Sequence, residues 1–202
     1  RTYSLAEILN NEVELNKIVH PLPLFKDYLR KGYYPFGIES EMTIRLNQVI
    51  IQALEVDIPQ YANLTVGTSR KLKHLLAIIA ESVPFKPNFT KIAGVLGVSR
   101  NSLDDYFYYM EKAGLILQLR NNTGGVRGLG KVEKVYLNNA NIIYNLSPGK
   151  ADIGNVRETF FFNQMQVNQE VITGKKADFM IGDFTFEIGW CCPSGAHQAE
   201  PR

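Results

Sequence analysis

Cysteine is scarce in this chain, since Cys191 and Cys192 are the only two among 202 residues and they are adjacent. Adjacent cysteines exclude a framework of spaced disulfides. The three histidines, His20, His74 and His197, form no spaced cluster with them, so a four-ligand Cys/His zinc site is also excluded. The absence of cysteine from the first 190 residues fits a reducing compartment, although cysteine can also be rare by composition alone. We expect a cytoplasmic protein.

Long apolar runs are also missing. The longest strongly apolar run covers residues 75–80, whereas a membrane-spanning helix needs ~20 residues. Charged residues interrupt every candidate signal peptide near the N-terminus. We therefore expect no membrane partner. The hydrophobic content of 45% is that of an ordinary globular chain and excludes wholesale disorder.

The chain has no strong net charge of one sign, because 22 basic residues face 20 acidic ones. The charges are nevertheless unevenly distributed. Residues 70–134 hold 11 basic and 5 acidic residues, a net charge of +6, whereas residues 1–69 and 135–202 each carry −2. This basic middle segment indicates either a surface that binds nucleic acid or a solvated, lysine-rich face.

The order of elements in the basic segment is that of a winged helix-turn-helix. A helix over 70–83 is followed by a short helix closed by Gly97 and by a longer helix, 100–113, with Ser99 as its N-cap. Strand patterns over 115–120 and 132–137 then flank a turn rich in glycine and asparagine.

The second helix of such a motif places its N-terminal residues in a DNA groove. The candidate nucleic-acid-binding residues are therefore Ser99, Arg100, Asn101, Ser102 and, on or beside the loop between the strands, Arg120, Arg127 and Lys131. Asp104 and Asp105 follow on the same helix and would repel phosphates. The residues thus leave double-stranded DNA and a protein partner equally open.

A glycine loop in this segment matches part of a phosphate-binding motif. Residues 125–131 have the spacing G-x-x-x-x-G-K, but Val132 stands where Ser or Thr should ligate magnesium. The loop also opens a strand and not a helix, whose N-terminus would face the phosphates. We therefore expect a hairpin loop, and no ATP hydrolysis by this chain.

Three carboxylates form the other candidate site. Glu158 lies on an expected helix, and Asp178 and Glu187 lie on successive strand-like segments. If they converge, they could hold Mg²⁺, which would activate water for phosphodiester cleavage; the alternative is three isolated surface carboxylates. A nuclease usually has a lysine two residues after the last acid, and here that position is Gly189.

Helices are predicted on both sides of the basic segment. Residues 1–69 are expected to be helical, with helices over 2–18, 24–30 and 40–56, the last capped by Ser40. Residues 149–189 are expected to form a helix, 153–167, and strands over 169–173, 177–181 and 184–188. Residues 190–202 show no periodicity, so a non-native or disordered tail is expected there.

Four segments together resemble the C-terminal half of prokaryotic AAA-type ATPases, and they occur in the family's order: 24–35, 45–50, 134–139 and 156–164. The resemblance covers roughly residues 20–189. It implies that residues 1–69 follow an absent ATPase core, which would carry the ATP, that residues 70–148 are a winged helix, and that residues 149–189 begin a restriction-endonuclease-like fold. Glu158, Asp178 and Glu187 match the acidic positions of that fold.

The sequence departs from this family after Gly189, where relatives continue with lysines and this chain continues with Trp190. We therefore expect a truncated and inactive nuclease-like segment. The predicted fold is mainly α, with a helical N-terminal region, a winged helix-turn-helix and a short C-terminal α/β piece.

The predicted function is that of a non-catalytic fragment of a larger ATPase that binds DNA or a protein through its winged helix. A Mg-dependent nuclease that uses Glu158, Asp178 and Glu187, or a scaffold that positions the protein's own ATPase domain, are the alternatives. The exposed edge of the C-terminal strands also suggests a homodimer.

Overall fold

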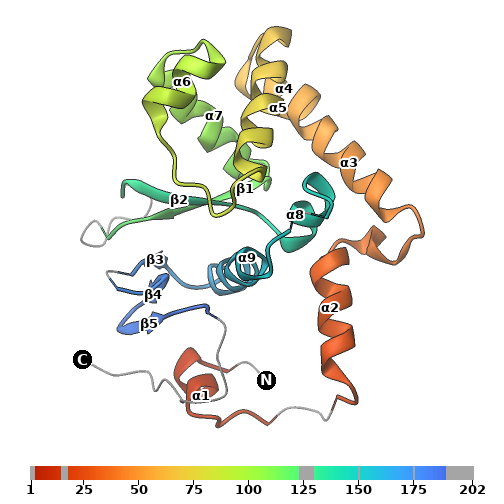
Figure 1. Ribbon diagram of the computed structural model, residues 1–202, viewed down its shortest axis with the longest axis vertical. Helices are drawn as coiled ribbons and strands as arrows, with labels where there is room; N and C mark the ends of the chain where they lie inside the picture. The colour runs from red at the N-terminus through yellow and green to blue at the C-terminus, as the bar shows by residue number, and fades with distance from the viewer. Residues whose placement is uncertain (1–2, 15–17, 123–129, 150, 175, 190–202) are drawn as a thin grey trace.

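The computed structural model describes residues 3–14, 18–122, 130–149, 151–174 and 176–189, and Figure 1 shows their arrangement. Of the described residues, 55% are helical and 12% lie in strands. The strands form a five-stranded mixed sheet, so the fold is α/β. The predicted mainly α fold with only a short α/β piece is therefore wrong.

The helices and strands follow one another along the chain with short connections. The helices are α1 (Leu5–Leu9), α2 (Pro21–Lys31), η1 (Pro35–Ile38), α3 (Met42–Gln52), η2 (Ala53–Asp57), α4 (Ile58–Ala62), α5 (Val66–Ala80), α6 (Phe89–Leu96), α7 (Arg100–Lys112), α8 (Ala140–Leu146) and α9 (Ile153–Met165). The strands are β1 (Ile116–Arg120), β2 (Val132–Leu137), β3 (Val171–Thr173), β4 (Phe179–Ile181) and β5 (Phe184–Phe186). No helix among the described residues is long and apolar enough to cross a membrane.

The sheet has the strand order β2-β1-β3-β4-β5, and one parallel pair joins its two halves. The hairpin β1–β2 is antiparallel, as are the pairs β3–β4 and β4–β5. Between these halves, β1 runs parallel to β3 through the pair Arg120 and Ile172. Strands from before and after the boundary predicted between residues 148 and 149 thus belong to one sheet. Local patterns located the strands, but they carry no information about pairing between distant segments.

One hydrophobic core crosses the molecule from the helices into the sheet. It includes Leu46 of α3, Leu72 of α5, Leu103 of α7, Val135 of β2 and Phe179 of β4, all nearly inaccessible to solvent. Figure 1 shows α5, α6 and α7 on one side of the hairpin β1–β2 and α9 with β3–β5 on the other. The shared core explains why the two sides are held as one body.

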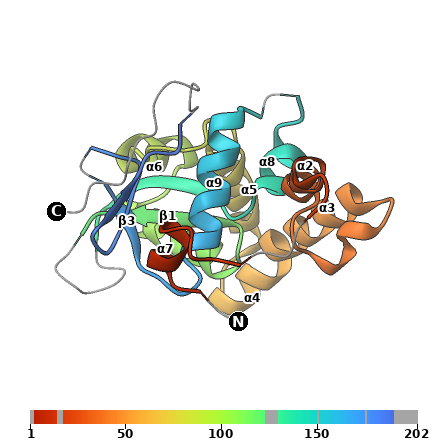
Figure 2. The ribbon, with the colours of Figure 1, turned by 90° about the horizontal axis from the view of Figure 1, so that it is seen from below.

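Helix α9 packs against the sheet through aromatic rings, and Figure 2 shows it running beside the strands. Phe161 contacts Phe186 of β5 with ring centroids 5.0 Å apart, and Phe162 contacts Tyr136 of β2 at 5.4 Å. Both rings also lie within 6 Å of the Phe179 ring, at 5.2 and 5.7 Å. Ring pairs at these separations stabilise a core beyond the area that they bury.

The N-terminal helices differ from their predicted limits. Helix α1 ends at Leu9, because Asn11 adopts a left-handed conformation. The helical path from α3 continues through η2 into α4, and Pro59 stands in the first turn of α4. The predicted N-cap Ser40 is wrong, because Glu41 holds that position without a side-chain hydrogen bond. Helix α8 was not predicted.

Helix α2 is attached to the rest of the fold at Gly32. This residue has φ +72°, and the side-chain amide of Asn141 lies directly against its Cα. The Asn141 Nδ2 donates a hydrogen bond of 2.9 Å to the Lys31 carbonyl, and Asn141 itself is buried at the start of α8. The contact fixes the end of α2 against the start of α8.

Candidate nucleic-acid interface and carboxylate cluster

Helices α6 and α7 form a helix-turn-helix with a polar cap at each N-terminus. The Asn88 side chain accepts a 3.0 Å hydrogen bond from the Lys91 backbone N–H, which begins α6. Gly97 ends α6 in a left-handed conformation, and Ser99 accepts a 3.1 Å hydrogen bond from the Ser102 N–H to begin α7. Such caps satisfy N–H groups that a helix leaves unpaired. The prediction of Ser99 as an N-cap is confirmed.

The first turn of α7 presents polar side chains to solvent. Arg100 and Asn101 are exposed, and the Arg100 guanidinium lies 5.9 Å from the Phe89 ring centroid. Ser102 is half-buried, and its hydroxyl lies 2.8 Å from that of Ser99. The opposite face of α7 packs into the core through Leu103, Tyr106, Phe107 and Met110. The helix is therefore fixed in orientation while its N-terminal turn is accessible.

The hairpin and α5 support this motif. Phe85, between α5 and α6, pairs with Val135 of β2 through two backbone hydrogen bonds of 2.8 and 2.7 Å. The Lys71 ammonium of α5 donates a 3.0 Å hydrogen bond to the Gly97 carbonyl in the turn. Lys71 thus stabilises the turn between α6 and α7, and the segment at Phe85 stabilises the hairpin.

The basic residues of this region fall into two groups, those that make no ion pair among the described residues and those that pair with acidic neighbours. Arg70, Lys86, Lys91 and Arg100 are exposed and make no ion pair within the described part of the chain. Asp104 and Asp105, one turn along α7 from Arg100, are exposed as well. The accessible surface therefore carries both signs of charge, with the basic groups more widely spread.

Two of the predicted nucleic-acid-binding residues at the hairpin pair with acidic neighbours. Arg120 is half-buried, with its guanidinium 3.6 Å from the Glu111 carboxylate and 3.3 Å from the Gly130 carbonyl. Lys131 is exposed and pairs with Glu133 at 3.3 Å. The third, Arg127, lies outside the described residues, as does most of the glycine loop. Arg120 thus contacts α7 and the loop at the loop end of the hairpin.

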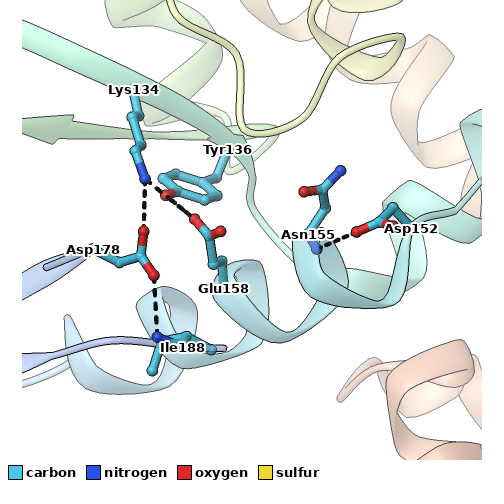
Figure 3. Close-up of polar contacts among 7 residues, drawn as sticks. All are labelled: Lys134, Tyr136, Asp152, Asn155, Glu158, Asp178 and Ile188. Carbon is cyan, nitrogen blue, oxygen red and sulfur yellow. Dashed lines mark hydrogen bonds and ion pairs between the residues drawn. The ribbon is translucent and has the colours of Figure 1, made fainter. Parts of the chain in front are cut away.

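The carboxylates Glu158 and Asp178 meet at a lysine, as Figure 3 shows. The Lys134 ammonium lies 3.0 Å from Asp178 Oδ1 and 3.4 Å from Glu158 Oε2. The Tyr136 hydroxyl donates a 2.7 Å hydrogen bond to Glu158 Oε2, and the Ile188 backbone N–H donates one of 3.1 Å to Asp178 Oδ2. We call Lys134, Tyr136, Glu158 and Asp178 the carboxylate cluster.

The carboxylate cluster is largely withdrawn from solvent. The side chains of Lys134, Glu158 and Asp178 are only 18%, 16% and 18% exposed. Burial alone would lower the pKa of Lys134, but the hydrogen bonds and charges of Asp178 and Glu158 together raise this pKa above its usual value. Burial and the hydrogen bond to Glu158 likewise raise the pKa of Tyr136 well above its usual value. Lys134 is therefore charged and Tyr136 neutral at physiological pH.

The third predicted carboxylate lies apart. Glu187 is exposed, and no three His, Cys, Asp or Glu side chains in the described ranges lie close enough to hold a metal ion. Neither Lys134 nor Tyr136 was predicted as a member of the site. Their spacing on β2 was the available signal, because residues two apart on a strand point to the same face.

The carboxylate cluster does not fit Mg²⁺ in this arrangement. Magnesium needs oxygen ligands at about 2.0–2.1 Å in an octahedron. The Lys134 ammonium already lies within hydrogen-bond range of both carboxylates, so a metal ion between them would meet a positive charge. The chemistry of the cluster as it stands is that of a hydrogen-bonded ion-pair network that connects β2, α9 and the residues before β4.

Comparison with known proteins gives one match. The model of a family described as a domain of unknown function (DUF8612) matches residues 22–153. The match runs from α2 to the first residue of α9, so it includes the helix-turn-helix and Lys134 but neither Glu158 nor Asp178. No curated protein and no solved structure matches the chain.

Proposed function

The chain belongs to this family of domains of unknown function (DUF8612), and from its geometry we propose that it is a non-catalytic module that binds double-stranded DNA through α6 and α7. One observation carries the proposal. The second helix of a helix-turn-helix begins with an exposed Arg100 and Asn101, while its other face is fixed in the core.

The surrounding elements support this proposal. Helix α5, the bridge at Phe85, α6, α7 and the hairpin β1–β2 follow one another as in a winged helix. In helix-turn-helix proteins the second helix enters the major groove, and its N-terminal residues contact base edges. Arginine bonds guanine and asparagine bonds adenine through paired hydrogen bonds. Arg100 and Asn101 are the two side chains of that kind in the first turn of α7.

The acidic pair on α7 limits the affinity that we expect. Asp104 lies four residues after Arg100, which places it about 6 Å further along the helix axis. That distance is shorter than the screening length of ~8 Å at physiological salt, so Asp104 and Asp105 weaken the attraction of Arg100 for phosphates. The positive end of the helix dipole acts at the N-terminus, where DNA would approach. We therefore expect weak, salt-sensitive binding dominated by the first turn.

The test is a fluorescence-anisotropy titration of the chain with a random-sequence duplex at low and moderate salt. Affinity should fall steeply with salt, because phosphate contacts release counterions from DNA. Arg100→Ala should weaken binding more than Lys26→Ala, whose lysine is exposed on α2 outside the basic segment. No binding at low salt, or equal effects of the two substitutions, would overturn the proposal.

A failed titration would favour a protein-interaction role, in which α6 and α7 bind a partner protein or the ATPase domain of a larger protein. A pull-down between this chain and such an ATPase domain tests that alternative. The nuclease alternative has no comparable support, because Glu187 lies outside the carboxylate cluster and Lys134 lies between the other two carboxylates.

A further inference from the structure

We propose that Lys134 is the resident cation of the carboxylate cluster, where its ammonium takes the place that a divalent metal ion would hold between Glu158 and Asp178. The cluster is then a metal-independent lock between the hairpin and the C-terminal elements. The inference stands on the carboxylate cluster alone and does not depend on DNA binding.

The contacts of the lysine come from three separate elements. Lys134 lies on β2, Glu158 on α9 and Asp178 just before β4, and a single nitrogen atom bonds both carboxylates. The remaining contacts are also made by the chain itself, since Tyr136 bonds Glu158 and the Ile188 N–H bonds Asp178. The lysine thus links segments that the hydrogen bonds of the sheet do not connect directly.

The charge balance predicts what happens when the lysine is removed. With Lys134 present, the two carboxylates and the ammonium sum to −1. Without it, two negative charges face each other in a site that is mostly buried, and like charges in such a site repel strongly. A divalent cation would neutralise the pair completely. A chain without Lys134 should therefore acquire an affinity for divalent cations that the natural chain lacks.

The distances favour a large cation. The carboxylate oxygens stand 3.0 and 3.4 Å from the ammonium nitrogen. Calcium takes oxygen ligands at about 2.3–2.6 Å and tolerates irregular geometry, whereas magnesium requires about 2.0–2.1 Å in a strict octahedron. The carboxylates would have to move less to bind Ca²⁺. The vacated site should therefore prefer Ca²⁺ to Mg²⁺.

The experiment is thermal unfolding of the whole chain in EDTA, CaCl₂ or MgCl₂ at constant ionic strength. We expect the natural chain and Lys26→Ala, a surface-lysine control, to unfold at a temperature that does not depend on the added ion. Lys134→Ala should unfold earlier in EDTA. Saturating CaCl₂ should raise its Tm by about 3 °C or more, which is the shift that ligand binding to the folded state brings to a chain of this size. MgCl₂ should raise it less.

A second substitution identifies the binding site. Glu158→Gln introduced into Lys134→Ala should abolish the response to calcium. If Lys134→Ala does not fold in EDTA, recovery of its fold in CaCl₂ supports the proposal. If it folds in neither, Lys134→Met, which keeps the aliphatic stem, carries the same titration.

Two results would overturn the inference. The first is a natural chain that is itself stabilised by Ca²⁺ or Mg²⁺, with the effect lost in Glu158→Gln; the cluster would then be a metal centre, and the nuclease alternative would gain its missing support. The second is a Lys134 variant that is as stable as the natural chain and does not respond to either ion.

Discussion

Replacing Gly32 by alanine should destabilise the fold strongly, although it adds only one methyl group. Gly32 has φ 72° and ψ −157°, a region that only glycine enters freely. The new Cβ would lie 2.5 Å from Asn141 Nδ2 and 2.9 Å from Asn141 Cγ. The amide would have to move, and it is the group that bonds the Lys31 carbonyl at 2.9 Å.

The magnitude follows from these two effects. Backbone strain of this kind costs about 1–3 kcal/mol, and loss of the partly buried hydrogen bond to Lys31 costs about 1–2 kcal/mol more. The sum, roughly 2–5 kcal/mol, corresponds to a decrease in Tm of about 4–20 °C for a chain of this length. Circular dichroism during thermal or urea unfolding measures it.

A matched control is available in α6. Gly94 is exposed in the middle of that helix, and a Cβ there meets nothing within 4 Å. Gly94→Ala should stabilise the protein by up to about 1 kcal/mol, because alanine favours a helix more than glycine does. In an Asn141→Ala background, Gly32→Ala should lose the part of its cost that comes from the clash. Free energies of unfolding extrapolated from urea carry an error of about 10–15%. A Gly32→Ala variant whose free energy of unfolding lies within about 0.5 kcal/mol of that of the natural chain would refute the reasoning.

Three further predictions concern single side chains. Ser99→Ala removes the N-cap of α7 and should cost about 0.5–2 kcal/mol in urea unfolding; an unchanged midpoint would show that the cap is dispensable. Phe179→Ala removes the β4 ring that packs against α9 and should lower the free energy of unfolding by about 3–5 kcal/mol. A smaller loss would mean that α9 moves to fill the cavity. Burial and the neighbouring Tyr33 raise the pKa of Tyr34 to about 12. The unfolded phenol ionises near pH 10, so this contribution to stability is complete below about pH 10 and disappears as the pH rises towards 12. Tyr34→Phe should show a smaller alkaline loss of stability in unfolding measured across that range.

The capped helices α6 and α7 could be predicted from the sequence because their signals are local. The caps at Asn88 and Ser99, the left-handed Gly97 and the apolar faces of α6 and α7 lie within a few residues of one another. Strand β2 was located without error for the same reason, and β1 within one residue.

The joined sheet could not be predicted, because it depends on distant pairing. Arg120 meets Ile172 across the predicted domain boundary, and neither residue has a local feature that selects the other. The carboxylate cluster could be predicted only in part, for a similar reason. Glu158 and Asp178 stand out by charge, but Lys134 joins them only because the sheet places β2 beside α9. The acid at Glu187 follows the same sequence pattern, yet it lies exposed after β5.

The parallel pairing of β1 with β3 also determines where this chain can be truncated. The family match stops at Ile153, but the core does not. A chain that ended there would lose α9 and β3, and with them Phe162, which packs on Tyr136. It would expose an aromatic surface and the unpaired edge of β1, a combination that promotes aggregation. The family match therefore ends inside the hydrophobic core of this structure.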